Sequence, residues 1–107
     1  MAELAAQHKA LDLRGYHVEG LTLLADSFLL CSASSDPQLR AICRAVKDGM
    51  AEIGVRPLRS DGKPAEGWLV LDYGTIIFHV FRKEKREFYD LDGLWADAPE
   101  IDLGVEA

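Results

Sequence analysis

The chain has 107 residues and a mass of 11.8 kDa, which leaves room for one domain because domains typically hold about 100–150 residues. Hydrophobic residues make up 49% and charged residues 28% of the chain, a balance typical of a globular protein that needs neither metal nor disulfide to close its core. The 12 Lys and Arg against 18 Asp and Glu give a net charge of -6. This balance argues against nucleic acid as a direct partner, because affinity for phosphate depends on clustered cations.

Membrane and export signals are not evident in the sequence. The longest mainly apolar stretch, 68–81, is interrupted by Asp72 and His79 and is shorter than the roughly 20 residues that a membrane helix needs. The N-terminal residues lack the continuous apolar segment of a signal peptide, so a cytoplasmic location and no membrane contact are expected. Cys31 and Cys43 lack a CxxC spacing and fall at positions expected to be apolar, which favours reduced structural thiols.

The first half of the chain predicts a short helix over 2–10, strands over 16–21 and 26–32, and then a long helix. Ser35 or Asp36 followed by Pro37 is typical of a helix start. The long helix is expected to run to Ile53, with Gly54 as its C-terminal cap. Its apolar residues recur at intervals of three and four: Leu39, Ile42, Cys43, Val46, Met50 and Ile53.

The second half predicts a loop over 56–67 and then a β-hairpin over 68–81. A two-residue turn at Tyr73-Gly74 would place Asp72 opposite Thr75. Alternation then assigns one face to the core and leaves a mixed second face. The core face holds Leu69, Leu71, Ile76, Phe78 and Val80, and the mixed face holds Trp68, Val70, Asp72, Thr75, Ile77 and His79.

The C-terminal part is predicted to contain a solvated basic run over 82–86 and a short helical segment in which Phe88, Leu91 and Trp95 pack against the domain. Tyr89 falls on a different face of that segment. Residues 96–107 hold four acidic residues, Glu106 among them, and no cation, so we expect a frayed acidic tail after a single domain over 1–95.

Two groups of residues are candidates for function. Asp26, Asp72 and His79 could form a metal or acid–base set, although Asp26 opens a strand and Asp72 precedes a tight turn, where carboxylates accept local backbone hydrogen bonds. A single histidine in a strand is most often a hydrogen-bonded, partly buried residue, which is the alternative for His79. The sequence contains no Walker loop, dinucleotide fingerprint, nucleophile elbow or zinc spacing, so neither a catalytic residue nor a cofactor is predicted.

The large aromatic residues form the second group. Trp68, Tyr73 and Tyr89 are of the kind that supplies most binding energy at protein interfaces. A core role is an equal alternative for Trp68. For Tyr73 an interaction role is favoured, because a hairpin turn is normally exposed.

Four blocks in order resemble the ribosomal silencing factors, also called the Iojap-like family. They are KALDL at 9–13, DSFLLCSASS at 26–35, WLVLDYGTIIFHVF at 68–81 and REFYDLDGLW at 86–95. Thr75 stands where the family usually has aspartate, Ala33 where it has glycine, and Asp92 where it has glutamate.

The resemblance implies a small α/β domain with a mixed sheet of about five strands flanked by helices, in a topology related to the nucleotidyltransferases but without their catalytic signature. It implies a translation repressor, not an enzyme, that binds the large ribosomal subunit through ribosomal protein uL14 on the intersubunit face. Such a factor blocks joining of the small subunit and represses translation under nutrient limitation. A homodimer of the free protein is compatible with the family.

The resemblance also implies that Trp68, Tyr73 and Tyr89 contact the partner, with Asp72 and Arg86 as neighbours. The alternative roles are turn stabilisation for Asp72 and local ion pairing for Arg86. The acidic charge is expected to favour docking on a basic ribosomal protein, with little direct contact to RNA. The alternative hypothesis is a degenerate nucleotidyltransferase-like domain that binds nucleotide and metal through Asp26, Asp72 and His79.

Overall fold

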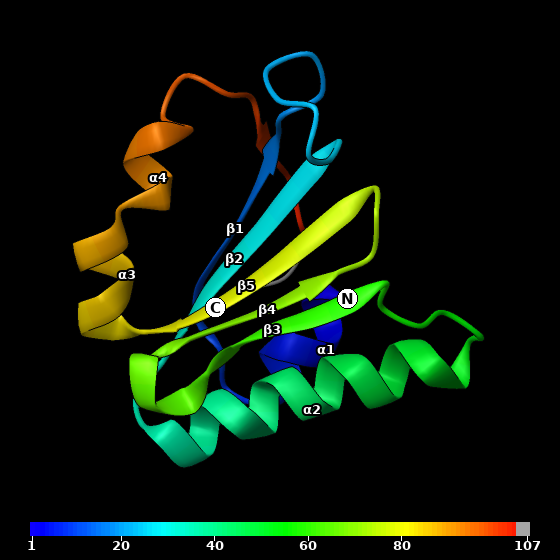
Figure 1. The fold of residues 1–107 in the computed structure, drawn as a ribbon, viewed down its shortest axis with the longest axis vertical. Coiled ribbons are helices and arrows are strands. Elements are labelled where there is room, and N and C mark those ends of the chain that lie inside the picture. The colour runs from blue at the N-terminus through cyan, green and yellow to red at the C-terminus, as the bar shows by residue number, and fades with distance from the viewer. Residues whose placement is uncertain (105–107) are drawn as a thin grey trace.

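The computed structural model describes residues 1–104, which form one mixed sheet with helices on both faces (Figure 1). The sheet order is β3-β4-β5-β2-β1-β6, and among the strands of residues 1–104 only β2 and β5 pair in parallel. The strands are β1 (Leu11–His17), β2 (Ser27–Ala33), β3 (Arg59–Lys63), β4 (Trp68–Asp72), β5 (Ile76–Arg82) and β6 (Glu100–Ile101). The helices are α1 (Ala2–Gln7), α2 (Asp36–Glu52), α3 (Lys83–Tyr89) and α4 (Leu91–Leu94), with a 3-10 turn, η1, at Pro64–Glu66.

Helix α2 begins where its sequence predicts and ends one residue earlier than predicted, at Glu52, with Ile53 rather than Gly54 as its C-terminal cap. The Ser35 hydroxyl accepts a hydrogen bond from the Gln38 N–H at 3.2 Å, and Pro37 lies in the first turn. Leu39, Ile42 and Val46 are fully buried against the sheet. The helix prediction is therefore confirmed, because capping and apolar periodicity are both encoded within this segment.

Both faces of the sheet bury apolar side chains. The face under α1 and α2 contains Leu29, Cys31, Leu71, Phe78 and Val80, as predicted for the hairpin. The face under α3 and α4, at the left in Figure 1, buries a second cluster of Tyr16, Val18, Ala25, Phe28, Leu30, Ile77, Phe81 and Ala98. The hairpin face that the sequence marks as mixed is thus a second core, because α4 and Trp95 cover part of it.

The β4–β5 hairpin turns one residue later than predicted. Asp72 pairs with Ile77 rather than Thr75, and the Tyr73 N–H donates to the Ile76 carbonyl at 2.9 Å, so the turn lies at Gly74-Thr75. This register differs from the prediction by two residues. An even shift keeps every side chain on its expected face, which is why the face assignment holds although the pairing does not.

Two segments of the chain differ from their predictions. The first strand occupies 11–17 rather than 16–21, and the expected loop over 56–67 contains β3 and η1. All five residues of β3 are exposed, so this edge strand lacks the alternating apolar signal on which the prediction depended. Within residues 1–104, no helix has the length and apolar character needed to cross a membrane.

The tail is ordered over part of the range that was predicted to be frayed. Ala98 is buried, and Glu100–Ile101 pair with β1 as β6. A Cβ on Gly15 would lie 3.2 Å from Cβ of Ile101, so glycine in β1 allows this close approach. Acidic composition alone does not reveal a strand that is held by such a long-range contact. Residues 105–107, including Glu106, lie outside the described residues.

Candidate partner-binding site

Trp68, the first residue of β4, lies on the sheet face covered by α3 and α4. Its indole stacks on Phe81 with 5.0 Å between ring centroids, and its centroid lies 4.6 Å from that of Tyr89. The indole N–H donates to Nδ1 of His79 at 3.1 Å. Packing and this hydrogen bond hold the half-buried ring in one orientation, so it is presented to a neighbour at little entropic cost.

The end of α3 presents two further aromatic side chains. Tyr89 is 38% exposed and Phe88 is 73% exposed, and their rings meet edge to face at 5.2 Å. The prediction that Phe88 packs with Leu91 and Trp95 is wrong. The helix stops at Asp90, whose φ of 50° is left-handed, so these residues do not share one continuous helix.

A largely apolar groove of about 360 Å³ lies beside Trp68, between the sheet and α4. Its apolar lining consists of Leu24, Phe28, Trp68, Val70, Ile77, Leu91, Leu94 and Trp95, and its polar lining of Arg59, Asp61, Asp72 and His79. Leu24 and Leu94 are 68% and 67% exposed at its rim. We call Trp68, Phe88, Tyr89, Leu24 and Leu94, together with this groove, the aromatic surface.

His79 is buried in the wall of the groove and is 6% exposed. Burial lowers its pKa to about 4, so the imidazole is neutral at neutral pH. Because Nδ1 accepts the Trp68 N–H, the proton of the neutral ring is on Nε2, which has no hydrogen-bond partner within residues 1–104. The geometry gives His79 the role of orienting Trp68.

Asp72 and Asp26 have structural surroundings. One carboxylate oxygen of Asp72 accepts the Gly74 N–H at 2.8 Å in the hairpin turn, and the other lies 3.7 Å from Nε of Arg59. Asp26 is exposed, and its backbone N–H pairs with the Thr75 carbonyl. No group of three His, Cys, Asp or Glu within residues 1–104 is placed to hold a metal ion.

Tyr73 does not lie on the aromatic surface. Alternation along β4 turns its ring to the α2 side of the sheet, where it packs on the first core. Its hydroxyl is buried without a hydrogen-bond partner in the described part of the chain, and burial raises its pKa. The expectation of an exposed ring is therefore wrong, because β4 continues its pairing through this residue.

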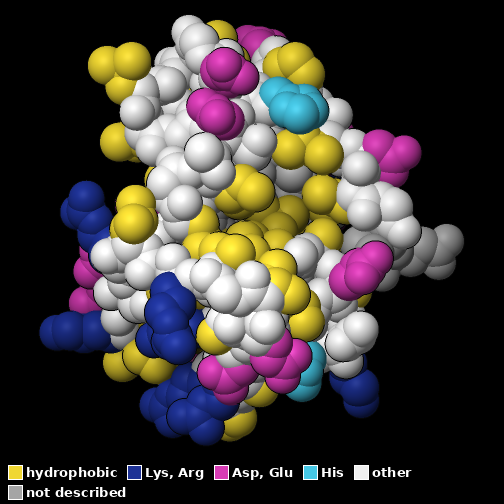
Figure 2. All heavy atoms as spheres, turned by 90° about the vertical axis from the view of Figure 1, so that its right-hand side faces the viewer, with side chains coloured by type: hydrophobic (Ala, Val, Ile, Leu, Met, Phe, Trp, Pro, Cys, Tyr) yellow, Lys and Arg dark blue, Asp and Glu magenta, His cyan; other side chains and the backbone are white. Residues whose placement is uncertain are grey.

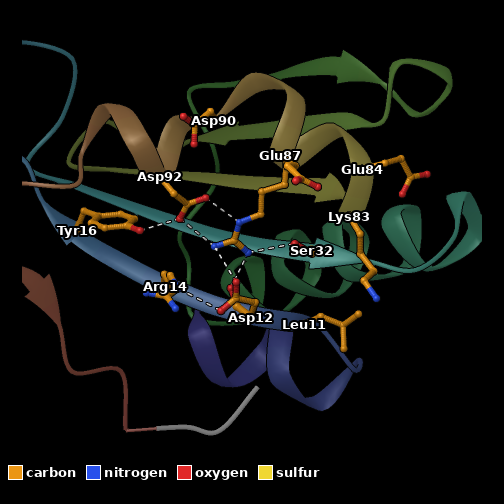
Figure 3. Close-up of a pocket in the computed structure, with 11 residues that line it drawn as sticks. Leu11, Asp12, Arg14, Tyr16, Ser32, Lys83, Glu84, Glu87, Asp90 and Asp92 are labelled. Carbon is orange, nitrogen blue, oxygen red and sulfur yellow. Dashed lines mark hydrogen bonds and ion pairs between the residues drawn. The ribbon is translucent and has the colours of Figure 1, made fainter.

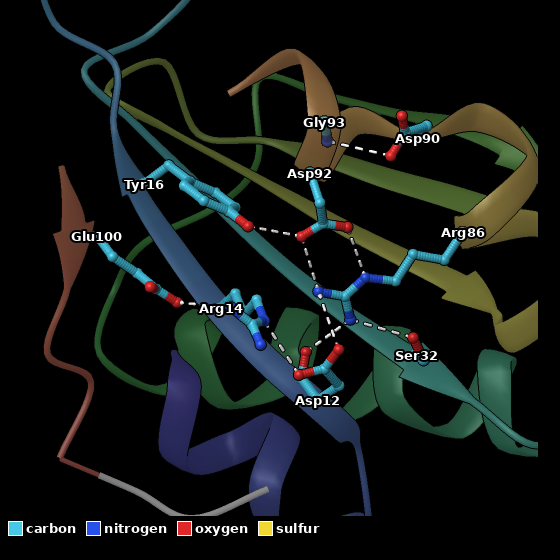
Figure 4. Close-up of polar contacts among 9 residues, drawn as sticks. All are labelled: Asp12, Arg14, Tyr16, Ser32, Arg86, Asp90, Asp92, Gly93 and Glu100. Carbon is cyan, nitrogen blue, oxygen red and sulfur yellow. Dashed lines mark hydrogen bonds and ion pairs between the residues drawn. The ribbon is translucent and has the colours of Figure 1, made fainter. Parts of the chain in front are cut away.

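Arg86 is only 7% exposed, and it lies at the centre of the polar network in Figure 4. Its guanidinium donates to both carboxylate oxygens of Asp92 at 2.9 and 3.0 Å, to the Asp12 carbonyl at 2.6 Å and to the Ser32 hydroxyl at 3.1 Å. Tyr16 donates to the same Asp92 carboxylate at 2.7 Å. The prediction of a wholly solvated run over 82–86 is thus wrong at its last residue.

The charges in this network stabilise one another. Burial by itself lowers the pKa of Arg86, but the hydrogen bonds and negative charge of Asp92 outweigh it and leave that pKa raised. For Asp92, burial raises the pKa, and the hydrogen bonds from Arg86 and Tyr16 more than compensate and lower it. Both groups therefore remain ionised, and they join β1, β2, α3 and α4.

A polar pocket of about 510 Å³ opens beside this network (Figure 3). Its lining includes five acidic side chains and three basic ones, and the donors of Arg86 are occupied by the protein. An excess of carboxylates repels phosphate groups. The pocket thus lends no support to the nucleotide-binding alternative.

Sequence reasoning missed three exposed members of the aromatic surface. Phe88 was assigned to the interior, and Leu24 and Leu94 were not singled out. The run Leu21-Thr22-Leu23-Leu24 was a usable signal, because apolar residues in a loop that precedes a strand are not required by the core.

A protein family described as "Ribosomal silencing factor during starvation" matches residues 1–107. The chain belongs to this family. It is 40% identical over 95 residues to the ribosomal silencing factor of Bacillus subtilis, covering 89% of this chain and 80% of that protein. A solved structure from Bacillus halodurans has a TM-score of 0.82 and 30% identity, covering 95% of this chain and 92% of that one. Another from Chromobacterium violaceum has a TM-score of 0.85 and 25% identity, covering 99% and 88%.

Membership confirms the resemblance seen in the four sequence blocks, and with it the α/β fold with a mixed sheet. It also gives the general role, which is that of a regulatory, ribosome-associated factor that silences translation.

Proposed function

We propose that this ribosomal silencing factor binds the large subunit by docking its aromatic surface on ribosomal protein uL14, and that its bulk then blocks joining of the small subunit. The observation that supports this proposal is the exposure of Phe88, Tyr89 and Leu94 around the fixed ring of Trp68. Exposed apolar side chains gathered at the rim of a groove are typical of interaction surfaces, and rigid aromatic anchors often dominate their energy.

To block joining of the small subunit, the bound protein only has to occupy space between the two subunits. The domain measures 34 × 33 × 26 Å along its principal axes. A body of this size on the intersubunit face would hold the two subunits tens of ångströms apart at that point, whereas hydrogen bonds and van der Waals contacts need separations below about 4 Å. Steric exclusion therefore requires no catalysis.

The remaining predicted residues have less direct roles in this proposal. Asp72 lines the groove, but its side chain is 22% exposed and already accepts the Gly74 N–H, so its role is to fix the hairpin turn beside the docked partner. Arg86 acts by holding α3 and α4, and Tyr73 by packing under the hairpin, since both side chains are largely occupied within the domain. A homodimer of the free protein would cover the same apolar surface when the ribosome is absent.

The test compares binding of variants to purified large subunits by co-sedimentation. Phe88→Ala and Tyr89→Ala should each weaken binding by about 2 kcal/mol, or about thirtyfold, as expected for truncated interface anchors. Ile53→Ala is the matched control, because Ile53 is 71% exposed and follows α2, away from the aromatic surface. Phe88 is so exposed that its truncation should leave stability unchanged.

A subunit-joining assay followed by light scattering then tests the outcome. Wild-type protein and Ile53→Ala should reduce the yield of joined ribosomes, and Phe88→Ala should do so only at higher concentration. Normal binding by folded Phe88→Ala and Tyr89→Ala would show that the partner docks elsewhere. Binding without any effect on joining would contradict the steric mechanism.

A further inference from the structure

The cations of this acidic protein are unevenly distributed. Between residues 40 and 59 there are five Lys or Arg and only two Asp or Glu, although the whole chain has a net charge of -6. Figure 2 shows Lys and Arg side chains gathered at the lower left, on the side of α2 and β3. The centre of the same view is a hollow floored by hydrophobic side chains.

Helix geometry aligns three of these cations. Arg40, Arg44 and Lys47 are spaced by four and three residues on the exposed side of α2, opposite the buried Leu39 and Val46. They extend over about 10 Å of the helix axis at a rise of about 1.5 Å per residue. They line one hollow of about 720 Å³, and none of the three forms an ion pair within residues 1–104.

The cationic row continues around the β3 edge of the sheet. A second hollow, of about 300 Å³, is lined by Lys47, Arg56 and Arg59. Arg59 also lines the apolar groove beside Trp68 on the opposite face of the sheet. We call Arg40, Arg44, Lys47, Arg56 and Arg59 the cationic face; through Arg59 it is continuous with the aromatic surface.

We infer that the cationic face contacts the phosphate backbone of ribosomal RNA when the aromatic surface is docked. This inference rests on the proposed function and extends it to a second partner. Four of the five cations are arginines, whose planar guanidinium groups can donate two parallel hydrogen bonds to one phosphate. The three cations on α2 form no ion pair within residues 1–104, so their charges are free to meet a line of phosphates.

The net negative charge and this cationic face have complementary effects. Acidic surface elsewhere repels RNA, so the protein does not coat RNA at random, and only the docked orientation brings phosphates to the cationic face. The sequence predicted little direct contact with RNA, and the inference confines that contact to the cationic face. An acidic protein surface is the alternative partner for these cations, and the experiment below distinguishes it from RNA.

The experiment measures the Kd of wild-type protein, Arg40→Gln/Arg44→Gln and Lys9→Gln/Lys83→Gln for large subunits between about 50 and 200 mM salt. Both double variants remove two positive charges from exposed side chains, but Lys9 and Lys83 lie outside the cationic face. The arginine variant should bind at least about tenfold more weakly at low salt, and its log–log salt slope should fall by about 2. The lysine variant should resemble the wild type.

Binding of each protein to isolated uL14 identifies the partner of the cations. The inference requires wild-type affinity of Arg40→Gln/Arg44→Gln for the isolated protein together with weaker binding to whole subunits. Equal losses on both would assign the cations to an acidic protein surface and overturn it. An unchanged salt slope on subunits would also overturn it and leave the proposed function intact, whereas no binding by the wild type would overturn both.

Discussion

Replacing Asp92 with Asn tests how the Arg86 network stabilises the fold. Arg86 is 7% exposed, so its charge cannot be rehydrated without moving α3, and Asp92 supplies two of its hydrogen bonds. Breaking a buried ion pair by removing one partner typically costs about 3–5 kcal/mol. Asp92 is 29% exposed and the Asn side-chain oxygen can still accept the hydrogen bond from the Tyr16 hydroxyl, so we expect a loss of about 3 kcal/mol, near the lower end of that range.

The reverse substitution should cost less. Arg86→Met leaves Asp92 without its cation, but this carboxylate is partly solvated and keeps the Tyr16 hydrogen bond, so a loss of about 2 kcal/mol is expected. The double variant Arg86→Met/Asp92→Asn contains no buried charge at this position. Its loss should therefore be smaller than the sum of the single losses by at least about 1 kcal/mol.

Urea unfolding at pH 7, followed by circular dichroism and tryptophan fluorescence, gives the free energy of unfolding and the m value for each variant. Equal m values would show that the variants differ in stability rather than in the compactness of the end states. The reasoning fails if Asp92→Asn costs less than Arg86→Met, or if the two losses are additive in the double variant.

The stability of the wild type and of Asp92→Asn should also depend differently on pH. The pKa of Asp92 is lowered in the fold from its ordinary value of 3.8, so its contribution is complete above that pH and is lost as the pH falls through the folded pKa. Wild-type stability should therefore decline from about pH 4 downward more steeply than that of Asp92→Asn. Parallel profiles would show that the carboxylate is not stabilised by folding.

Three further predictions concern other parts of the domain. Because the pKa of His79 is lowered to about 4, the unfolded chain binds its proton first as the pH falls from 6.5, and wild-type stability should drop by up to about 3 kcal/mol by pH 4. Unfolding curves of His79→Gln should lack this part of the loss, and an unchanged profile would refute the assignment. Burial raises the pKa of the Cys31 thiol to about 12, so a thiol reagent at pH 8 should modify half-buried Cys43 first and Cys31 only at the rate at which the protein unfolds. Rapid labelling of both cysteines would contradict the burial of Cys31. Gly62 has a φ of +93°, and a Cβ there would collide with the Trp68 carbonyl, so Gly62→Ala should lower the unfolding free energy by about 2 kcal/mol. A neutral result would show that β3 shifts to relieve the collision.

Residue patterns predicted the elements whose signals are local. Helix α2 has its cap, its first-turn proline and its apolar spacing within one segment, and strand β2 is one continuous apolar run. Strand β3 could not be predicted in the same way, because all its residues are exposed and its pairing with β4 alone makes it a strand. An edge strand depends on its neighbour, which the local sequence does not describe.

The same distinction between local and long-range signals applies to the residues of the candidate site. Trp68 and Tyr89 were singled out as aromatic candidates, and the structure brings them to a centroid separation of 4.6 Å. The position of Tyr73 was misjudged because the exposure of a turn residue depends on which strand pair it continues. Phe88 was misplaced because the left-handed break at Asp90 interrupts an otherwise helical spacing.

By itself the sequence determined the family, the α/β class, the long helix and the apolar faces of the hairpin, since all of these follow from local motifs or from a period of two or about 3.6 residues. Only the tertiary structure decided which polar groups are buried. Arg86 donates to the Asp12 carbonyl across 74 positions of the chain and is buried, whereas Lys83 in the same helix is exposed. The physical reason is that periodicity is a property of neighbours in sequence, whereas burial and pairing depend on groups that folding brings from far along the chain.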